Sequence, residues 1–150
     1  MIEIEGDLWE AHALGDWIAI TTNPVINTLG ELVMGRGVAL QAAQRFPTLP
    51  KVLAQHIKTN GNHVAAFPAY KIIAFPVKHH WRHAASPLLI ERSAQELVKL
   101  DGLVRRPIYM VRPGCGNGKL EWEAVKKIIG PILVGDDYIV VEKAEKAGGK

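Results

Sequence analysis

Short apolar segments of β-strand character alternate with longer segments of helical periodicity along the chain, and this alternation constrains the fold most. The clearest strand is Trp17–Thr22, which is uncharged and rich in β-branched residues. The other predicted strands are 1–4, 64–67, 71–75, 107–111 and 138–141, and the predicted helices are 37–46, 49–58, 87–100 and 121–129. Strands interleaved with helices are typical of a layered α/β domain.

Close connections between the early strands predict a mixed rather than a purely parallel sheet. Two short segments, 25–27 and 32–34, flank Gly30 and predict a small hairpin. A short Pro-Ala turn joins the strands at 64–67 and 71–75. Ligands of such sheets lie at the carboxyl ends of the strands, so the loops that follow the strands are the places to look for a site.

The composition is that of an ordinary globular protein, with 48% hydrophobic and 22% charged residues. A length of 150 residues predicts one domain over 1–143 and a disordered tail over 144–150. No apolar run approaches the ~20 residues of a membrane span, and the acidic start lacks the basic region of a signal peptide. The single cysteine excludes an internal disulfide. These features fit a cytoplasmic protein without membrane contact, and we expect a monomer.

A first glycine loop at 33–39 leads into a predicted helix. Its candidate ligand-binding residues are Gly35, Arg36, Gly37 and Val38. Glycines allow close approach of the backbone to a ligand, and a helix N-terminus presents free N–H groups with a partial positive charge, which suits a phosphate. The loop is not a dinucleotide fingerprint, because Leu40 occupies the third glycine position. A plain loop before a helix is the alternative.

A second glycine loop at 113–120 joins a predicted strand to a predicted helix. Its candidate residues are Gly114, Cys115, Gly116, Asn117 and Gly118. It is not a P-loop, because the glycine spacing is one residue short and Leu120 stands where Ser or Thr must hold magnesium. A turn that needs positive φ is the alternative. One diphosphate held from two sides would account for both loops.

Cations and an aromatic residue gather after the strand at 71–75. A lysine in a water-poor pocket beside other cations has a lowered pKa, and Lys78 is therefore a candidate nucleophile or electrostatic stabiliser. A solvated lysine is the alternative. His79, His80 and His83 resemble metal ligands, but the chain has no HExxH motif and no second ligand cluster, so we expect no metal. Cys115 has no obvious base and is not expected to be catalytic.

Polar residues follow the first two strands as well. Asp7, with Leu8 after it, can accept from an adenine amine or cap the next element, and the sequence alone favours the cap. Asn23 and Asn27 carry amides that can hold a ribose, although Asn-Pro is also a common turn starter.

Taken in chain order, these segments resemble the macrodomain family, the fold that binds ADP-ribose. The matching segments are 2–8, 22–23, 33–41, 46–47, 75–82 and 114–122. They are similar to the macrodomains that act as DNA ADP-ribosyl glycohydrolases in toxin–antitoxin systems and to the human terminal ADP-ribose protein glycohydrolase branch. Phage-encoded macro proteins share the layout. The resemblance implies a three-layer α/β/α fold with a mixed central sheet.

The resemblance also implies a role for each candidate. Asp7 is expected to accept from the adenine amino group, Leu8 to contact ADP-ribose, and Asn23 to approach the distal ribose. Lys78 matches the catalytic lysine of the DNA-directed branch. The residues expected to hold the diphosphate and distal ribose are Gly35, Arg36, Gly37 and Val38 on one side and Gly114, Cys115, Gly116, Asn117 and Gly118 on the other.

Two departures from the family pattern affect these expectations. The segment 23–34 is longer than usual, which leaves open whether Asn23 or Asn27 takes the ribose role. Gly118 stands where the human branch carries a catalytic aspartate, so a lysine-dependent mechanism is favoured. The expected function is hydrolysis of ADP-ribosyl conjugates of DNA, protein or phosphate at the distal ribose C1″, without a cofactor. The first alternative is a non-catalytic module that reads or sequesters ADP-ribose. A general nucleic-acid binder ranks last, because the sequence has no basic stripe.

Overall fold

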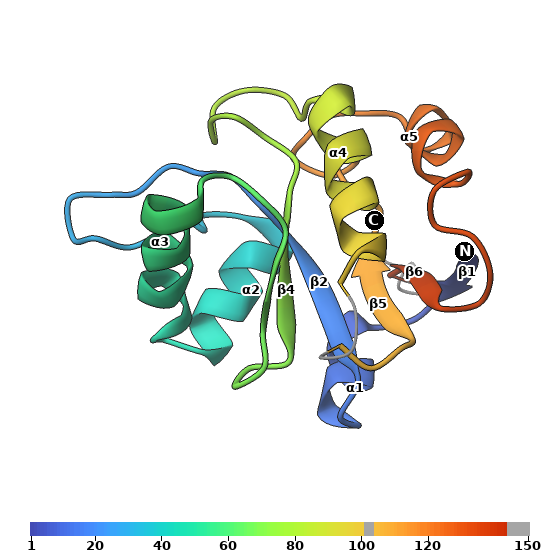
Figure 1. Cartoon of the computed structure of the whole chain (residues 1–150), viewed down its shortest axis with the longest axis horizontal. Helices are drawn as coiled ribbons and strands as arrows, with labels where there is room; N and C mark the ends of the chain where they lie inside the picture. Colours follow the sequence, from blue (N-terminus) through green and yellow to red (C-terminus); the bar gives the residue numbers. More distant parts are fainter. Residues whose placement is uncertain (101–103, 144–150) are drawn as a thin grey trace, which may run out of the picture.

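Six strands form a single sheet in the computed structural model, which describes residues 1–100 and 104–143 (Figure 1). The strands are β1 (Ile2–Glu5), β2 (Trp17–Thr22), β3 (Ala65–Phe67), β4 (Ile72–Pro76), β5 (Ile108–Val111) and β6 (Tyr138–Glu142). Their order in the sheet is β1-β6-β5-β2-β4-β3. All neighbours run parallel except β3, which pairs antiparallel with β4 at the edge. The prediction of a mixed sheet is therefore confirmed.

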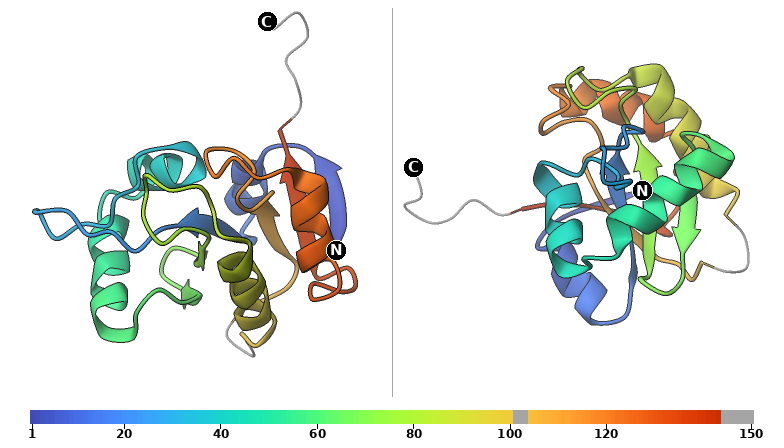
Figure 2. Two further views of the ribbon diagram at one scale, coloured as in Figure 1. Left: turned by 90° about the horizontal axis from the view of Figure 1, so that it is seen from above. Right: turned by 90° about the vertical axis from the view of Figure 1, so that its left-hand side faces the viewer.

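Helices cover both faces of this sheet. They are α1 (Leu8–Ala13), α2 (Gly37–Arg45), α3 (Leu49–Asn60), α4 (Pro87–Val98) and α5 (Trp122–Ile129). Figure 2 shows α2 and α4 on opposite sides of the strands, which gives the three-layer α/β/α fold that the resemblance implied. The sequence analysis missed α1, because six residues are too few to display a helical period.

The central strands send alternate side chains into two separate cores. In β2, Ile18 and Ile20 pack on the side of α1, α2 and α3. Trp17 and Ala19 pack on the side of α4 and α5. All four side chains are at most 6% exposed. Because both faces of β2 are buried, the strand reads as a continuous apolar run rather than as alternating apolar and polar residues.

The carboxyl ends of the parallel strands meet at one edge of the sheet. Thr22 of β2 is in register with Pro76 of β4, and the backbone N–H of Val77 donates to the carbonyl of Thr22 at 3.0 Å. The chain segments that follow β2 and β4 therefore leave the sheet side by side. This places Asn23 and Lys78, which are far apart in the sequence, in the same region.

The small hairpin predicted after β2 is present as a single antiparallel bridge between Ile26 and Leu32. The tail predicted for residues 144–150 lies outside the described residues. None of the helices in the described ranges is long and apolar enough to span a membrane.

Candidate functional site

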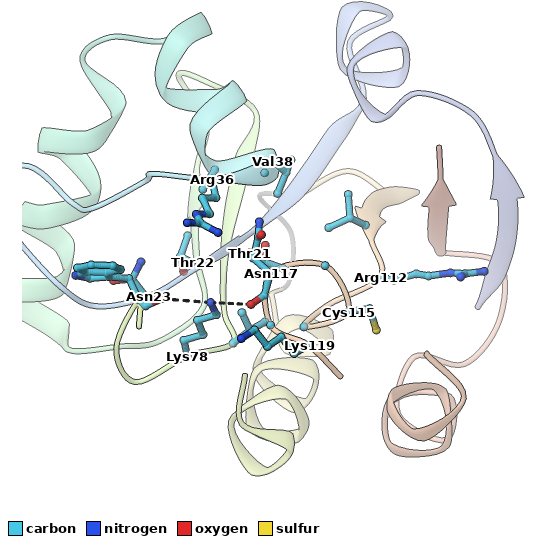
Figure 3. Close-up of a pocket in the computed structure, with 18 of the residues that line it drawn as sticks. Thr21, Thr22, Asn23, Arg36, Val38, Lys78, Arg112, Cys115, Asn117 and Lys119 are labelled. Carbon is cyan, nitrogen blue, oxygen red and sulfur yellow. Dashed lines mark hydrogen bonds between the residues drawn. The ribbon is translucent and has the colours of Figure 1, made fainter. Parts of the chain in front are cut away.

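A cleft of about 830 Å³ lies at the carboxyl ends of β2, β4, β5 and β6 (Figure 3). The segments that line it are 21–23, 33–39, 77–78, 81–83, 111–112, 114–119 and 141–143. This volume falls in the range of roughly 300–1,000 Å³ that is usual for small-molecule and cofactor sites. Both predicted glycine loops and the lysine segment after β4 contribute to one cavity.

The two glycine loops approach each other across this cleft. A Cβ atom added to Gly37 would lie 3.4 Å from the Asn117 side-chain nitrogen, and Gly37 itself has φ +59. Helix α2 begins at Gly37 with no side-chain cap and no acidic residue in its first turn. Its first N–H groups therefore lack an intrahelical partner and carry the positive end of the helix dipole.

The second loop supplies free backbone donors from the other side. Among the described residues, no group accepts a hydrogen bond from the backbone N–H of Gly116, Asn117 or Gly118. The loop is nevertheless fixed, because the N–H of Leu120 donates to the Gly114 carbonyl at 2.9 Å. Oriented backbone N–H groups of this kind bind anions.

Two glycines of the second loop are required by packing. A Cβ on Gly118 would lie 2.4 Å from the Gly114 carbonyl oxygen and 2.8 Å from Ala85 Cβ. Gly114 has φ +78, and a Cβ there would lie 2.7 Å from Ile90 Cδ1. An aspartate therefore cannot replace Gly118 without displacing the loop. The lysine-dependent mechanism stays a prediction.

Lys78 extends into the cleft between the two loops. Its Nζ donates to the carbonyl of Asn117 at 3.2 Å and to that of Trp81 at 3.4 Å, and Figure 3 shows its amine directed toward Arg36. Burial lowers the pKa of Lys78, and the positive charges of Arg36 and Lys119 lower it further. The lowered pKa is in the direction that the sequence predicted.

The backbone of Lys78 is held from outside the cleft by a residue that the sequence analysis missed. The side-chain amide of Asn62 donates to the Lys78 carbonyl at 3.2 Å. Asn62 lies in the connection between α3 and β3, and nothing in the local sequence distinguishes it from an ordinary turn residue.

Of the two candidate asparagines, Asn23 lines the cleft. Its side-chain oxygen accepts from Val25 N and its nitrogen donates to the Val33 carbonyl, both at 2.9 Å. Asn27 lies outside the cleft lining, and its side-chain oxygen accepts from the backbone of Leu29 and Glu31 within a turn. The ribose role of Asn23 stays a prediction, and its side chain already holds the first glycine loop in place.

Thr22 is a cleft residue that the sequence analysis did not select for a role. It is only 6% exposed, and its hydroxyl finds no hydrogen-bond partner among residues 1–100 and 104–143. Buried polar atoms are normally paired. The signal for Thr22 is its position, since it is a hydroxyl residue at the carboxyl end of a buried strand.

Asp7 and Leu8 lie outside the cleft lining. The Asp7 carboxylate is the N-cap of α1 and accepts from Trp9 N at 2.9 Å, while Leu8 is buried in the core. The N–H of Gly6 donates to the carbonyl of Glu142, which does line the cleft. Asp7 thus follows a residue that is hydrogen-bonded to the cleft wall, and its role toward adenine stays a prediction.

Cys115 and the histidines show no catalytic arrangement. Burial raises the pKa of the Cys115 thiol, which keeps it protonated near neutral pH. The His80 ring lies 5.3 Å from that of His83 and stacks on Trp81. Within the described part of the chain, no group of three or more His, Cys, Asp or Glu side chains is arranged to hold a metal ion.

The chain is similar to known proteins in sequence as well as in fold. No family model matches the chain. A DNA ADP-ribosyl glycohydrolase of Thermus aquaticus is 34% identical over 119 residues, which are 72% of this chain and 32% of that protein. The chain spans about a third of the length of the curated relatives that it matches.

Solved structures share nearly the whole fold. The macrodomain of Mycobacterium tuberculosis DarG has a TM-score of 0.77 and 25% identity, and the match covers 95% of this chain and 97% of that one. The macrodomain of Thermus aquaticus DarG has a TM-score of 0.70 and 28% identity, with the same coverage of 95% and 97%. The elements that surround the cleft therefore belong to a fold that these proteins have in common.

Proposed function

The chain belongs to the macrodomain family, in the branch of the DarG macrodomains, and on this premise we propose that it binds ADP-ribose and hydrolyses ADP-ribosyl conjugates of DNA. The first part of the proposal concerns the ligand. A diphosphate fits between the start of α2 and the second glycine loop, where free backbone N–H groups face each other across the cleft. This opposed pair of donor sets is the observation that carries the proposal.

The second part concerns the reaction. Lys78 stands at one end of the donor sets with a lowered pKa, so a larger fraction of its amine is neutral than in an exposed lysine. The neutral amine attacks C1″ of the distal ribose as the bond from C1″ to the acceptor breaks, and the proton released by the new secondary ammonium passes to the departing acceptor. Water then adds at C1″, which releases ADP-ribose and regenerates the lysine. The glycine loops hold the diphosphate so that C1″ is presented to Lys78.

Binding and turnover test the two parts separately. Titration calorimetry with ADP-ribose tests the first, and release of ADP-ribose from an ADP-ribosylated oligonucleotide tests the second. We expect Lys78→Ala to lower turnover by at least about 100-fold, a loss typical of a positioned catalytic group, while ADP-ribose binding is retained. Lys78→Arg is the matched control, since it keeps a charge but cannot supply a neutral amine. Full turnover by Lys78→Ala would exclude the lysine mechanism.

A non-catalytic ADP-ribose-binding module is the second candidate. Glu142 is the sole carboxylate among the described residues that line the cleft, and it is paired with Arg112 at 2.9 Å. No free carboxylate is therefore available in the described lining to activate water. Tight ADP-ribose binding without product from ADP-ribosylated DNA, ADP-ribosylated protein or ADP-ribose 1″-phosphate would favour this candidate.

A further inference from the structure

Trp81 lies at the mouth of the cleft with 44% of its surface exposed. None of the described residues accepts a hydrogen bond from its indole nitrogen. The His80 ring is stacked 5.6 Å away, and the guanidinium carbon of Arg82 lies 4.8 Å from the Trp81 ring centroid. Tryptophan is enriched at binding interfaces, where its ring offers a large apolar surface and its N–H a hydrogen-bond donor.

The loop that carries Trp81 is fixed at its base. The N–H of Ser86 donates to the Val77 carbonyl at 2.8 Å, and that of Ala85 donates to the Gly118 carbonyl at 3.0 Å. The Trp81 carbonyl accepts from Lys78 Nζ at 3.4 Å. One hydrogen bond therefore links the Trp81 backbone to Lys78, the proposed nucleophile. An acceptor group that leaves C1″ beside Lys78 must pass close to this loop.

The surroundings of this loop carry positive charge without neighbouring acids in the sequence. Residues 32–90 and 104–120 contain no Asp or Glu. These two stretches supply most of the cleft lining, including the five cations Arg36, Lys78, Arg82, Arg112 and Lys119. Of these, Arg112 is paired with Glu142. We refer to Trp81, Arg82 and Lys119 together as the cationic rim. The net charge of the chain is only +3, so the positive character of the rim comes from the segregation of charges and not from their sum.

We propose that the cationic rim binds a single strand of nucleic acid beside the nucleotide that carries ADP-ribose. A neighbouring base stacks on Trp81, and backbone phosphates pair with Arg82 and Lys119. Aromatic side chains beside cations are the means by which proteins hold single strands without reading their sequence. The proposal rests on the proposed function, because it assumes that the modified nucleotide is presented to Lys78.

Two substrates that differ only in the length of the acceptor test the proposal. One is an ADP-ribosylated single nucleoside and the other is the same nucleoside within an oligonucleotide of about ten residues. We expect Trp81→Ala to raise KM for the oligonucleotide roughly tenfold relative to KM for the nucleoside, as for the loss of one base stack. Trp81→Phe is the matched control and should recover most of the difference. Arg82→Gln should reduce the salt dependence of oligonucleotide KM by about one phosphate contact.

Several outcomes would overturn the proposal. An equal loss on nucleoside and oligonucleotide would mean that Trp81 supports only the catalytic centre. An equal loss on an ADP-ribosylated peptide would mean that the rim is not selective for nucleic acid. If the wild type neither binds ADP-ribose nor turns over any conjugate, the proposed function fails first. The rim is then tested by anisotropy of a labelled, unmodified single strand, where failure of the wild type to bind, or equal binding by Trp81→Ala, would overturn it.

Discussion

The two glycine loops look alike in the sequence but use their glycines for different reasons. In the first loop, a Cβ added to Gly35 would meet nothing within 4 Å. In the second loop, Gly114 and Gly118 are enclosed by the loop itself and by Ala85 and Ile90. A glycine that is free of protein contacts leaves space for a ligand, whereas an enclosed glycine maintains the shape of the loop that binds the ligand.

The largest effect is expected at Gly118. Gly118→Ala places a Cβ 2.4 Å from a backbone oxygen, and we expect the free energy of unfolding to fall by more than ~2 kcal/mol. Thermal unfolding should show a decrease in Tm of about 5 °C or more for a domain of this size.

Gly116→Ala is the matched control within the same loop. A Cβ at Gly116 would meet nothing within 4 Å, and its φ is not in the left-handed region. Its Tm should stay within about 2 °C of the wild type. Equal destabilisation by both substitutions would contradict the distinction between enclosed and free glycines.

For Gly35→Ala we expect a loss of ligand affinity rather than of stability, whereas for Gly118→Ala we expect a loss of stability. The protein itself accommodates the methyl group, but a diphosphate lying against the first loop does not. We expect ADP-ribose affinity to fall roughly tenfold, while Tm is unchanged or slightly raised because the unfolded chain loses freedom. Calorimetry and thermal unfolding on the same samples measure both. An unchanged affinity would remove the first loop from the binding surface.

The fold could be predicted from the sequence where local patterns decide the structure. β2 is a continuous apolar run, and α2 and α3 are delimited by Pro47 and Gly61. Helix α1 escaped prediction because its six residues carry little periodic signal, although the sequence favoured Asp7 as a cap and Asp7 is the N-cap of this helix.

The position of the site could also be predicted, since loops that follow parallel strands converge. The distinction between Gly116 and Gly118 could not be predicted, because it depends on how the loop folds back on the Gly114 carbonyl and on Ala85, which is distant in the sequence. The unpaired hydroxyl of Thr22 was likewise hidden, since whether a buried group has a partner is decided by the whole fold.

A smaller effect on ligand affinity is expected at Thr22, at the carboxyl end of β2. Thr22→Val keeps the shape of the side chain and removes a hydroxyl that has no partner among the described residues. If a ribose hydroxyl pairs with it, ADP-ribose affinity should fall about 3–10-fold, equivalent to ~1 kcal/mol for one neutral hydrogen bond. The free energy of unfolding should not decrease. A lower stability with unchanged affinity would show that the hydroxyl serves the protein and not a ligand.

The smallest expected effect is a shift in the pKa of Lys78, which is lowered by residues of both glycine loops. Its pKa is lowered first by burial, then by Arg36 of the first loop and then by Lys119 beside the second. If the neutral amine attacks C1″, kcat rises with pH through this pKa.

Removing a neighbouring positive charge favours the protonated amine, so Arg36→Gln should move the midpoint of the kcat profile to higher pH. Lys119→Gln should move it in the same direction but by less, because Lys119 is the smaller cause. The position of the midpoint, and not the size of kcat, is the measurement, since both substitutions can also weaken diphosphate binding. A kcat that falls as pH rises would instead indicate that Lys78 acts as a cation that stabilises charge, and the attack at C1″ would then belong to water.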